Sequence, residues 1–440
     1  MKIIRMVVQH HRGNRIIKWL SFIIIISFVS KLAIGYILRD TFFKRGNNYS
    51  ALNNIAINLV KNHQFSIQTG IPSIEYEPLY PFLIAIGYNI FGKNWFGITF
   101  LQAILFALTT YLLFLIGRNI KNEIAGFIAA AYHSFYPPLF FHSLSIYDTT
   151  IFIFLCTLLL YLSVVQVKRK RNRGPFVLIG FVVGLSALCR GSIFFILPPV
   201  LIYLLLVSIF SYARPLLNLL IMAASFIITV SPWIVRNYYL TGNFLFSTHG
   251  GFGFWQGNNE RTAHYLKNNI SLDMVYLEIP PPTIYQNYPI KPRQPKDAMA
   301  VDGFYKSEAI KFIKNNPLPF LKLSLLKFIK FWTFIYNPSA SSYAYGDLRL
   351  RQLSYCCSFL PLLLVLPFGL IYLLKKSKSL FILFFGIFVS YTLAHMIIMG
   401  YSRLRLPLDP MIMILLGAVC SDISFRKILK RVDQALVRLR

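Results

Sequence analysis

Carboxylates are scarce in this chain, so the few that could do chemistry stand out. The 440 residues include only 15 Asp and Glu beside 45 Lys and Arg. Glu75 and Glu77 lie in the segment Glu-Tyr-Glu-Pro, and Asp148 lies in Tyr-Asp-Thr-Thr between two apolar runs. A carboxylate next to an acceptor hydroxyl can remove its proton as a general base. We therefore take Glu77, Asp148 and Glu75 as the candidate catalytic residues.

Two of these acids also have a structural interpretation. Asp148 would then be an ordinary polar residue at a membrane interface, and Glu77 would cap a helix that has Pro78 at its first position. An ionisable group at the mouth of a membrane helix bundle is nevertheless a functional candidate by default. The sequence leaves both interpretations open.

Arginines at the ends of apolar runs are the candidate ligands of a phosphate group. Guanidinium groups bind phosphate through paired hydrogen bonds, although such side chains also extend to lipid headgroups without a specific role. The sequence has no P-loop and no His-Glu-x-x-His pattern, and its five cysteines form no Cys-x-x-Cys. We therefore expect no cytoplasmic nucleotide chemistry, no metal centre of that type and no disulfide framework. The candidate phosphate-binding residues are Arg190, Arg236, Arg403 and Arg405.

The composition shows what kind of elements must position these residues. Hydrophobic residues make up 56% of the chain and charged residues 14%, against about 25% charged in soluble domains. The mean hydropathy is +0.57. These values exclude a soluble domain and predict an all-α polytopic membrane protein. The net charge of +30 then reflects Lys and Arg in cytoplasmic loops, and we expect no nucleic-acid partner.

Apolar runs of about 20 residues predict the membrane spans. The first run follows several basic residues and lacks a cleavage site, so it is expected to remain as an anchor. With this end in the cytoplasm, the basic run at 168–173 and the basic tail also fall inside, which places both termini in the cytoplasm. The ten expected spans are at about 16–37, 94–116, 124–141, 149–167, 175–189, 192–209, 216–233, 354–374, 380–399 and 406–422.

Three regions follow from this topology. Residues 1–233 form an N-terminal transmembrane module with a first outer loop at 38–93. Residues 234–353 form a second outer region, in which an amphipathic helix at about 321–336 lies in the membrane interface. Residues 354–440 contain the last transmembrane helices and the basic tail. All candidate site residues then lie at the outer face.

Several separated motifs resemble the membrane glycosyltransferases of the GT-C fold that use polyprenyl-phosphate sugars. The resemblance is to the dolichyl-phosphate-mannose-protein mannosyltransferase and aminoarabinose-transferase type. It implies a GT-C-like bundle of about ten helices with two large extracytoplasmic loops, in a bacterial inner membrane. The motifs are Glu77-Pro78-Leu79-Tyr80-Pro81, Tyr136-Pro137-Pro138, Asp148, Leu188-Cys189-Arg190, Pro232-Trp233-Ile234-Val235-Arg236 and Arg405-Leu406-Pro407.

The resemblance also implies a reaction. Such enzymes transfer a sugar from an undecaprenyl- or dolichyl-phosphate donor to a glycolipid or protein acceptor on the outer side, with inversion. Asp148 resembles the second acid of the family, and Glu77 the loop glutamate near the donor. The arginines are similar in placement to groups that hold the lipid phosphate. No cofactor is established by the motifs, and a divalent cation, Mg²⁺ or Mn²⁺, bound by Asp148 stays open, although nothing in the spacing demands it.

One departure from the family pattern concerns the first-loop Asp, whose position is taken here by Tyr49. Either Glu75 or Glu77 has taken over the role of base, or Asp40 serves, or the protein is a catalytically degenerate member that binds lipid. A transporter or flippase of lipid-linked saccharides is a further alternative. It would need no large folded outer region.

Overall fold

The structure is a computed structural model that describes residues 2–39, 51–167, 173–212, 214–270, 272, 294–334 and 348–421. Asp40, Tyr49, the basic tail and most of the basic run at 168–173 lie outside these residues. The described chain is a bundle of helices, in which the only strands are the short antiparallel pair β1 (Ser66–Gln68) and β2 (Ile71–Pro72).

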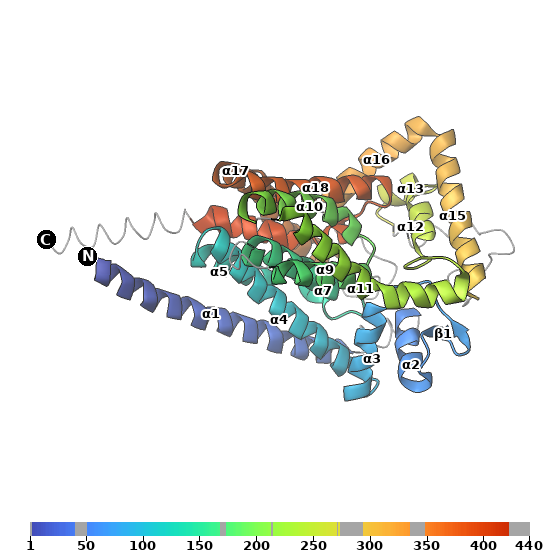
Figure 1. Ribbon diagram of the computed structural model, residues 1–440, viewed down its shortest axis with the longest axis horizontal. Helices are drawn as coiled ribbons and strands as arrows, with labels where there is room; N and C mark the ends of the chain where they lie inside the picture. Colours follow the sequence, from blue (N-terminus) through green and yellow to red (C-terminus); the bar gives the residue numbers. More distant parts are fainter. Residues whose placement is uncertain are drawn as a thin grey trace.

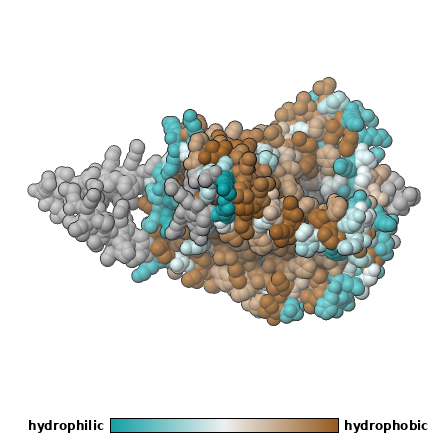
Figure 2. All heavy atoms as spheres, in the orientation of Figure 1, coloured by the Kyte–Doolittle hydropathy of each residue, from teal (hydrophilic) through white to brown (hydrophobic). Residues whose placement is uncertain are grey.

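Membrane-spanning helices form the body of the molecule, which confirms the expected all-α polytopic fold. In the described residues seven helices are long and apolar enough to cross a membrane. Two shorter apolar helices, α9 (Gly174–Ala187) and Asp409–Ser421, lie at two further expected spans. Hydrophobic residues cover the middle of the visible face, with hydrophilic residues towards its ends (Figure 2). The seven long helices are α1 (Lys2–Ile37), α4 (Trp95–Ile120), α7 (Thr149–Tyr161) with its extension η2 (Leu162–Gln166), α10 (Ile193–Ser211), α11 (Pro215–Thr241), α17 (Leu348–Lys376) and α18 (Lys378–Ile397).

The expected single span at 124–141 is wrong. The chain forms two helices there, α5 (Glu123–Ser134) and α6 (Pro137–His142), with Tyr136 in an extended conformation between them. Proline lacks an N–H and disfavours the helical conformation of the residue before it, so Pro137 ends the first helix. Gln102 of α4 donates to the carbonyl of Ser145 at 3.0 Å, which fixes the chain just before Asp148.

Glycines bring pairs of helices into close contact, as is usual where apolar helices associate in a membrane. A Cβ atom on Gly126 of α5 would lie 2.3 Å from the carbonyl oxygen of Phe114 on α4. A Cβ atom on Gly180 of α9 would lie 2.1 Å from the carbonyl oxygen of Met222 on α11. The backbones of these two pairs therefore approach too closely for a side chain.

Both outer regions gather at one end of the bundle, far from the N-terminus (Figure 1). The amphipathic helix expected at about 321–336 is α16, which spans Pro317–Trp332. The apolar stretch after Glu77 forms α3, which spans Leu79–Phe91. Lys327 of α16 is buried and donates to Asn258 Oδ1 at 2.8 Å and to the carbonyl of Ile397 at 3.1 Å. This lysine therefore ties α16 to the end of α18. The elements here are α2 (Ala51–Asn62), β1, β2 and α3 (Leu79–Phe91) from the first region, and α12 (Gly250–Gly257), α13 (Thr262–Lys267), α15 (Pro295–Asn315) and α16 (Pro317–Trp332) from the second.

Candidate active site

Asp148 and Arg190 form an ion pair at the end of the bundle where the two large loop regions gather. Asp148 immediately precedes α7, and Arg190 follows the end of α9. The Arg190 Nε donates to Asp148 Oδ2 at 2.7 Å, and Nη2 donates to Oδ1. Both side chains are about one-fifth exposed. Asp148 makes no side-chain cap to its helix, so its carboxylate holds the guanidinium instead.

Glu77 lies close to this pair. It accepts a hydrogen bond at 3.0 Å from Ser247 Oγ through its Oε1. Burial raises the pKa of Glu77 from 4.5 to about 7. The nearby charges act on this pKa in opposite directions, since Asp148 raises it and Arg190 lowers it. Glu77 therefore shares one electrostatic site with Asp148 and Arg190, and it holds its proton at higher pH than an ordinary carboxyl.

Contacts from two distant segments fix the loop that carries Glu77. The backbone N–H of Leu79 donates to the carbonyl of Leu188 at 2.9 Å, which joins the start of α3 to the end of α9. The N–H of Thr248 donates to the carbonyl of Ile74 at 3.0 Å. The ring of Tyr76 stacks on that of His249, with centroids 5.2 Å apart. The first and second outer regions therefore build this side of the site together.

Glu75 is buried, with 3% of its surface exposed. Glu75 and Glu77 flank Tyr76 in the sequence. Burial raises the pKa of Tyr76 most, and the two carboxylates raise it further. Asp148 acts on Glu77 directly, because its charge raises the pKa of Glu77. The interpretation of Glu77 as a helix cap is wrong, because Pro78 occupies the cap position of α3.

Arg403 lies at the same end of the helix bundle as the ion pair of Asp148 and Arg190. It is partly exposed, and its Nη2 donates to the hydroxyl of Tyr401 at 3.0 Å. Its guanidinium lies 5.3 Å from the ring centroid of Tyr147, the residue before Asp148. Arg403 and Arg190 together lower the pKa of His142, after burial, so both positive charges lie near that imidazole.

Arg236 and Arg405 are engaged by protein groups elsewhere. Arg236 donates to the carbonyls of Ser73 at 3.0 Å and Phe65 at 3.3 Å, and so fastens the first outer loop to α11. Arg405 has no exposed surface and forms an ion pair with Asp409 at 3.0 Å. These geometries give both arginines a role in the fold, and they leave Arg190 and Arg403 as the arginines at the site.

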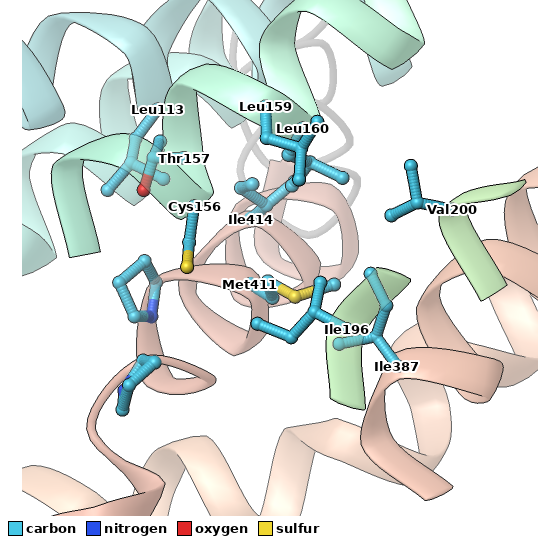
Figure 3. Close-up of a pocket in the computed structure, with 12 residues that line it drawn as sticks. Leu113, Cys156, Thr157, Leu159, Leu160, Ile196, Val200, Ile387, Met411 and Ile414 are labelled. Atoms are coloured by element: carbon cyan, nitrogen blue, oxygen red, sulfur yellow. The ribbon is translucent and has the colours of Figure 1, made fainter. Parts of the chain in front are cut away.

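An apolar cavity lies within the helix bundle. Its lining comes from α4, α7, α10, α18 and the start of the last helix, and it includes Pro407 and Pro410. Figure 3 shows the side chains of Cys156, Ile196 and Met411 around it. Pro407 follows Arg403 by four residues, so the segment that carries a site arginine continues directly into the cavity wall.

The residues described here do not fit a divalent cation at Asp148. Both oxygens of that carboxylate accept from a guanidinium, and a second cation would be repelled by it. Among the described residues no three His, Cys, Asp or Glu side chains come together as a ligand set.

Comparison with known proteins identifies the fold. Residues 75–235 match the family model described as dolichyl-phosphate-mannose-protein mannosyltransferase. A search of curated proteins gives no match. The Archaeoglobus fulgidus oligosaccharyltransferase in its apo form is 13% identical, with a TM-score of 0.55, over 94% of this chain and 52% of that one. This chain thus spans about half the length of that enzyme.

Two other solved structures are similar. AglB from the same archaeon, in complex with an inhibitory peptide and a dolichol-phosphate, is 14% identical with a TM-score of 0.52, over 94% of this chain and 52% of that one. ArnT from Cupriavidus metallidurans bound to undecaprenyl phosphate is 12% identical with a TM-score of 0.45, over 92% of this chain and 79% of that one. The chain is therefore a multi-pass membrane protein with the GT-C fold, and its residues 75–235 carry the sequence pattern of the dolichyl-phosphate-mannose-protein mannosyltransferases.

Proposed function

We propose that the protein transfers a sugar from a polyprenyl-phosphate donor to an acceptor hydroxyl at the outer face of the cytoplasmic membrane, with both termini in the cytoplasm. The observation that carries the proposal is the convergence of Glu77 on the Asp148–Arg190 pair. A base and a cation at one membrane surface are the groups that such a transfer needs. AglB, which shares the fold, has been solved with a dolichol-phosphate and a peptide.

The donor would lie with its phosphate between Arg190 and Arg403. The hydrogen bonds of Arg190 to Asp148 use Nε and Nη2, so the Nη1 group is the part of this guanidinium left for a phosphate oxygen. Asp148 positions Arg190 rather than touching the acceptor.

Glu77 would act as the general base. The acceptor oxygen attacks the anomeric carbon while its proton moves to the Glu77 carboxylate. The bond from that carbon to the phosphate oxygen breaks, and its electron pair stays on the polyprenyl phosphate. The phosphate then carries one more negative charge, which the two arginines stabilise. Attack from the side opposite to the leaving group inverts the anomeric centre.

Mass spectrometry of envelope glycolipids and glycoproteins tests the proposal. A deletion strain is complemented with the wild type, Asp148→Asn, Glu77→Gln, or the matched control Glu260→Gln, whose side chain is exposed. A saccharide should disappear on deletion and return with the wild type and the control. It should fall by about 100-fold or more with Glu77→Gln, the usual effect of losing a general base. Full restoration by Asp148→Asn and Glu77→Gln at equal expression would refute the site.

A further inference from the structure

His142 lies beside the proposed site with no assigned role. It is the last residue of α6, six positions before Asp148. Both of its ring nitrogens are buried, and within the described residues neither makes a hydrogen bond. Buried polar atoms without partners are rare in folded proteins and call for an explanation.

A small cavity lies beside this imidazole. His142 lines it together with Thr109 of α4 and with Thr149 and Thr150 at the start of α7. The cavity has room for a group about the size of one water molecule. It adjoins the ion pair, because the Thr149 hydroxyl accepts a hydrogen bond from Arg190 Nη2 at 3.3 Å.

The lining selects a neutral group over a charged one. The described residues that line the cavity are all uncharged: His142 stays neutral, since burial, Arg403 and Arg190 lower its pKa to about 3. An ammonium group would be repelled by the same two arginines, and a buried anion would lack a cation in direct contact. A neutral imidazole has one donor and one acceptor on opposite edges of its ring, so one of its two nitrogens can pair with a single hydroxyl.

We propose that His142 binds one free hydroxyl of the transferred sugar, and so selects against sugars that carry an amino or N-acetyl group at that position. This inference rests on the proposed function. It adds that the sugar of the donor carries an uncharged, unsubstituted hydroxyl at the position that His142 contacts. Thr149 and Thr150 supply the neighbouring hydroxyl groups. His142 is a specificity residue in this arrangement and takes no part in moving the acceptor proton.

The test uses the full-length protein in lipid nanodiscs with undecaprenyl phosphates that carry glucose, galactose or mannose, each with its single-deoxy forms. His142→Phe keeps a ring and removes both nitrogens, and His142→Asn keeps a donor and an acceptor. Transfer is measured as kcat/KM, and donor binding as the rise in the thermal unfolding midpoint. In the wild type, one deoxy position should lower kcat/KM by about 10- to 100-fold, as expected for an unpaired buried group.

With His142→Phe, kcat/KM for this one deoxy donor should equal kcat/KM for the unmodified sugar donor. For the other deoxy donors, the ratio of kcat/KM to that of the unmodified donor should stay at its wild-type value. His142→Asn should recover part of the discrimination. An equal loss with every donor, or no change in any ratio, would overturn the proposal, because a structural role gives no dependence on one hydroxyl. If donors bind but no sugar moves, the proposed function fails, and the binding data still decide whether His142 pairs with one hydroxyl.

Discussion

Replacing Arg405 by Met tests whether this arginine stabilises the fold or holds a ligand. Its side chain is wholly buried, and it donates to Asp409 Oδ1 at 3.0 Å and to the carbonyls of Phe331 at 3.0 Å and Thr333 at 3.2 Å. Asp409 also accepts from the hydroxyl of Tyr136 at 2.8 Å. One guanidinium thus joins the end of α16 to the last helix, and its carboxylate partner joins that helix to the chain before α6.

The size of the effect follows from what the substitution leaves behind. Arg405→Met leaves the Asp409 carboxylate buried with one neutral donor, and breaking such a buried pair costs about 3–5 kcal/mol. The double variant Arg405→Met with Asp409→Leu removes both charges, so it should be less destabilised than Arg405→Met alone. Arg403→Met is the matched control, because the guanidinium of Arg403 is partly exposed and donates to the hydroxyl of Tyr401.

Thermal unfolding of the detergent-solubilised protein measures these differences. The midpoint should fall by several degrees for Arg405→Met, recover in part in the double variant, and stay near the wild-type value for Arg403→Met. Binding of undecaprenyl phosphate, measured as the rise in that midpoint, should be lost with Arg403→Met. If Arg405→Met keeps the wild-type midpoint and loses lipid binding, Arg405 is a phosphate ligand and the structural argument is wrong.

Further changes test the base and the loop that carries it. Ser247→Ala removes a hydrogen bond that lowers the pKa of Glu77. The rising limb of the plot of kcat/KM against pH, expected near pH 7, should therefore move up by about half a pH unit to one pH unit. An unmoved limb would mean that Glu77 is not the base. Folding raises the pKa of Glu77 from 4.5 to about 7, so its contribution to stability is present at low pH and lost as pH rises through 7. Glu77→Gln should therefore reduce the fall in unfolding midpoint between pH 5 and 8, and an unchanged fall would contradict the shift. Arg236→Met should speed proteolysis of the 62–74 loop severalfold, with Arg236→Lys in between, and equal rates would show that Arg236 does not fasten it. Tyr49→Asp should leave transfer within about twofold, because a base is already present; a gain of about tenfold would favour the degenerate-member interpretation.

Hydropathy predicted the helical membrane architecture because it depends on local sequence. Most of the expected spans and the helix α16 follow from apolar runs and their limits. The failure at 124–141 came from the same rule, which counts apolar residues and ignores the conformational effect of Pro137. A pair of prolines after a tyrosine was the signal that could have placed the break.

The site was predicted only in part, because the partners of each candidate come from distant segments. Arg190 and Asp148 both drew attention as charges at span ends, but their pairing across 42 positions has no sequence signal. Ser247 lies 170 residues from Glu77 and nothing in its neighbourhood marks it. An arginine at a span end also looks the same whether it faces headgroups or is buried, as Arg405 is.

The two acids at the site differ in what occupies their oxygens, and the roles proposed for them rest on this difference. Asp148 accepts from Arg190 with both oxygens, so it is poorly placed to take a proton from an acceptor. Glu77 accepts from a neutral hydroxyl, and its pKa of about 7 is matched to a base that works near neutral pH. In the proposed mechanism the segment that ends at Pro78 brings a carboxylate to the ion pair, and this carboxylate takes the role of the acid that is missing at Tyr49.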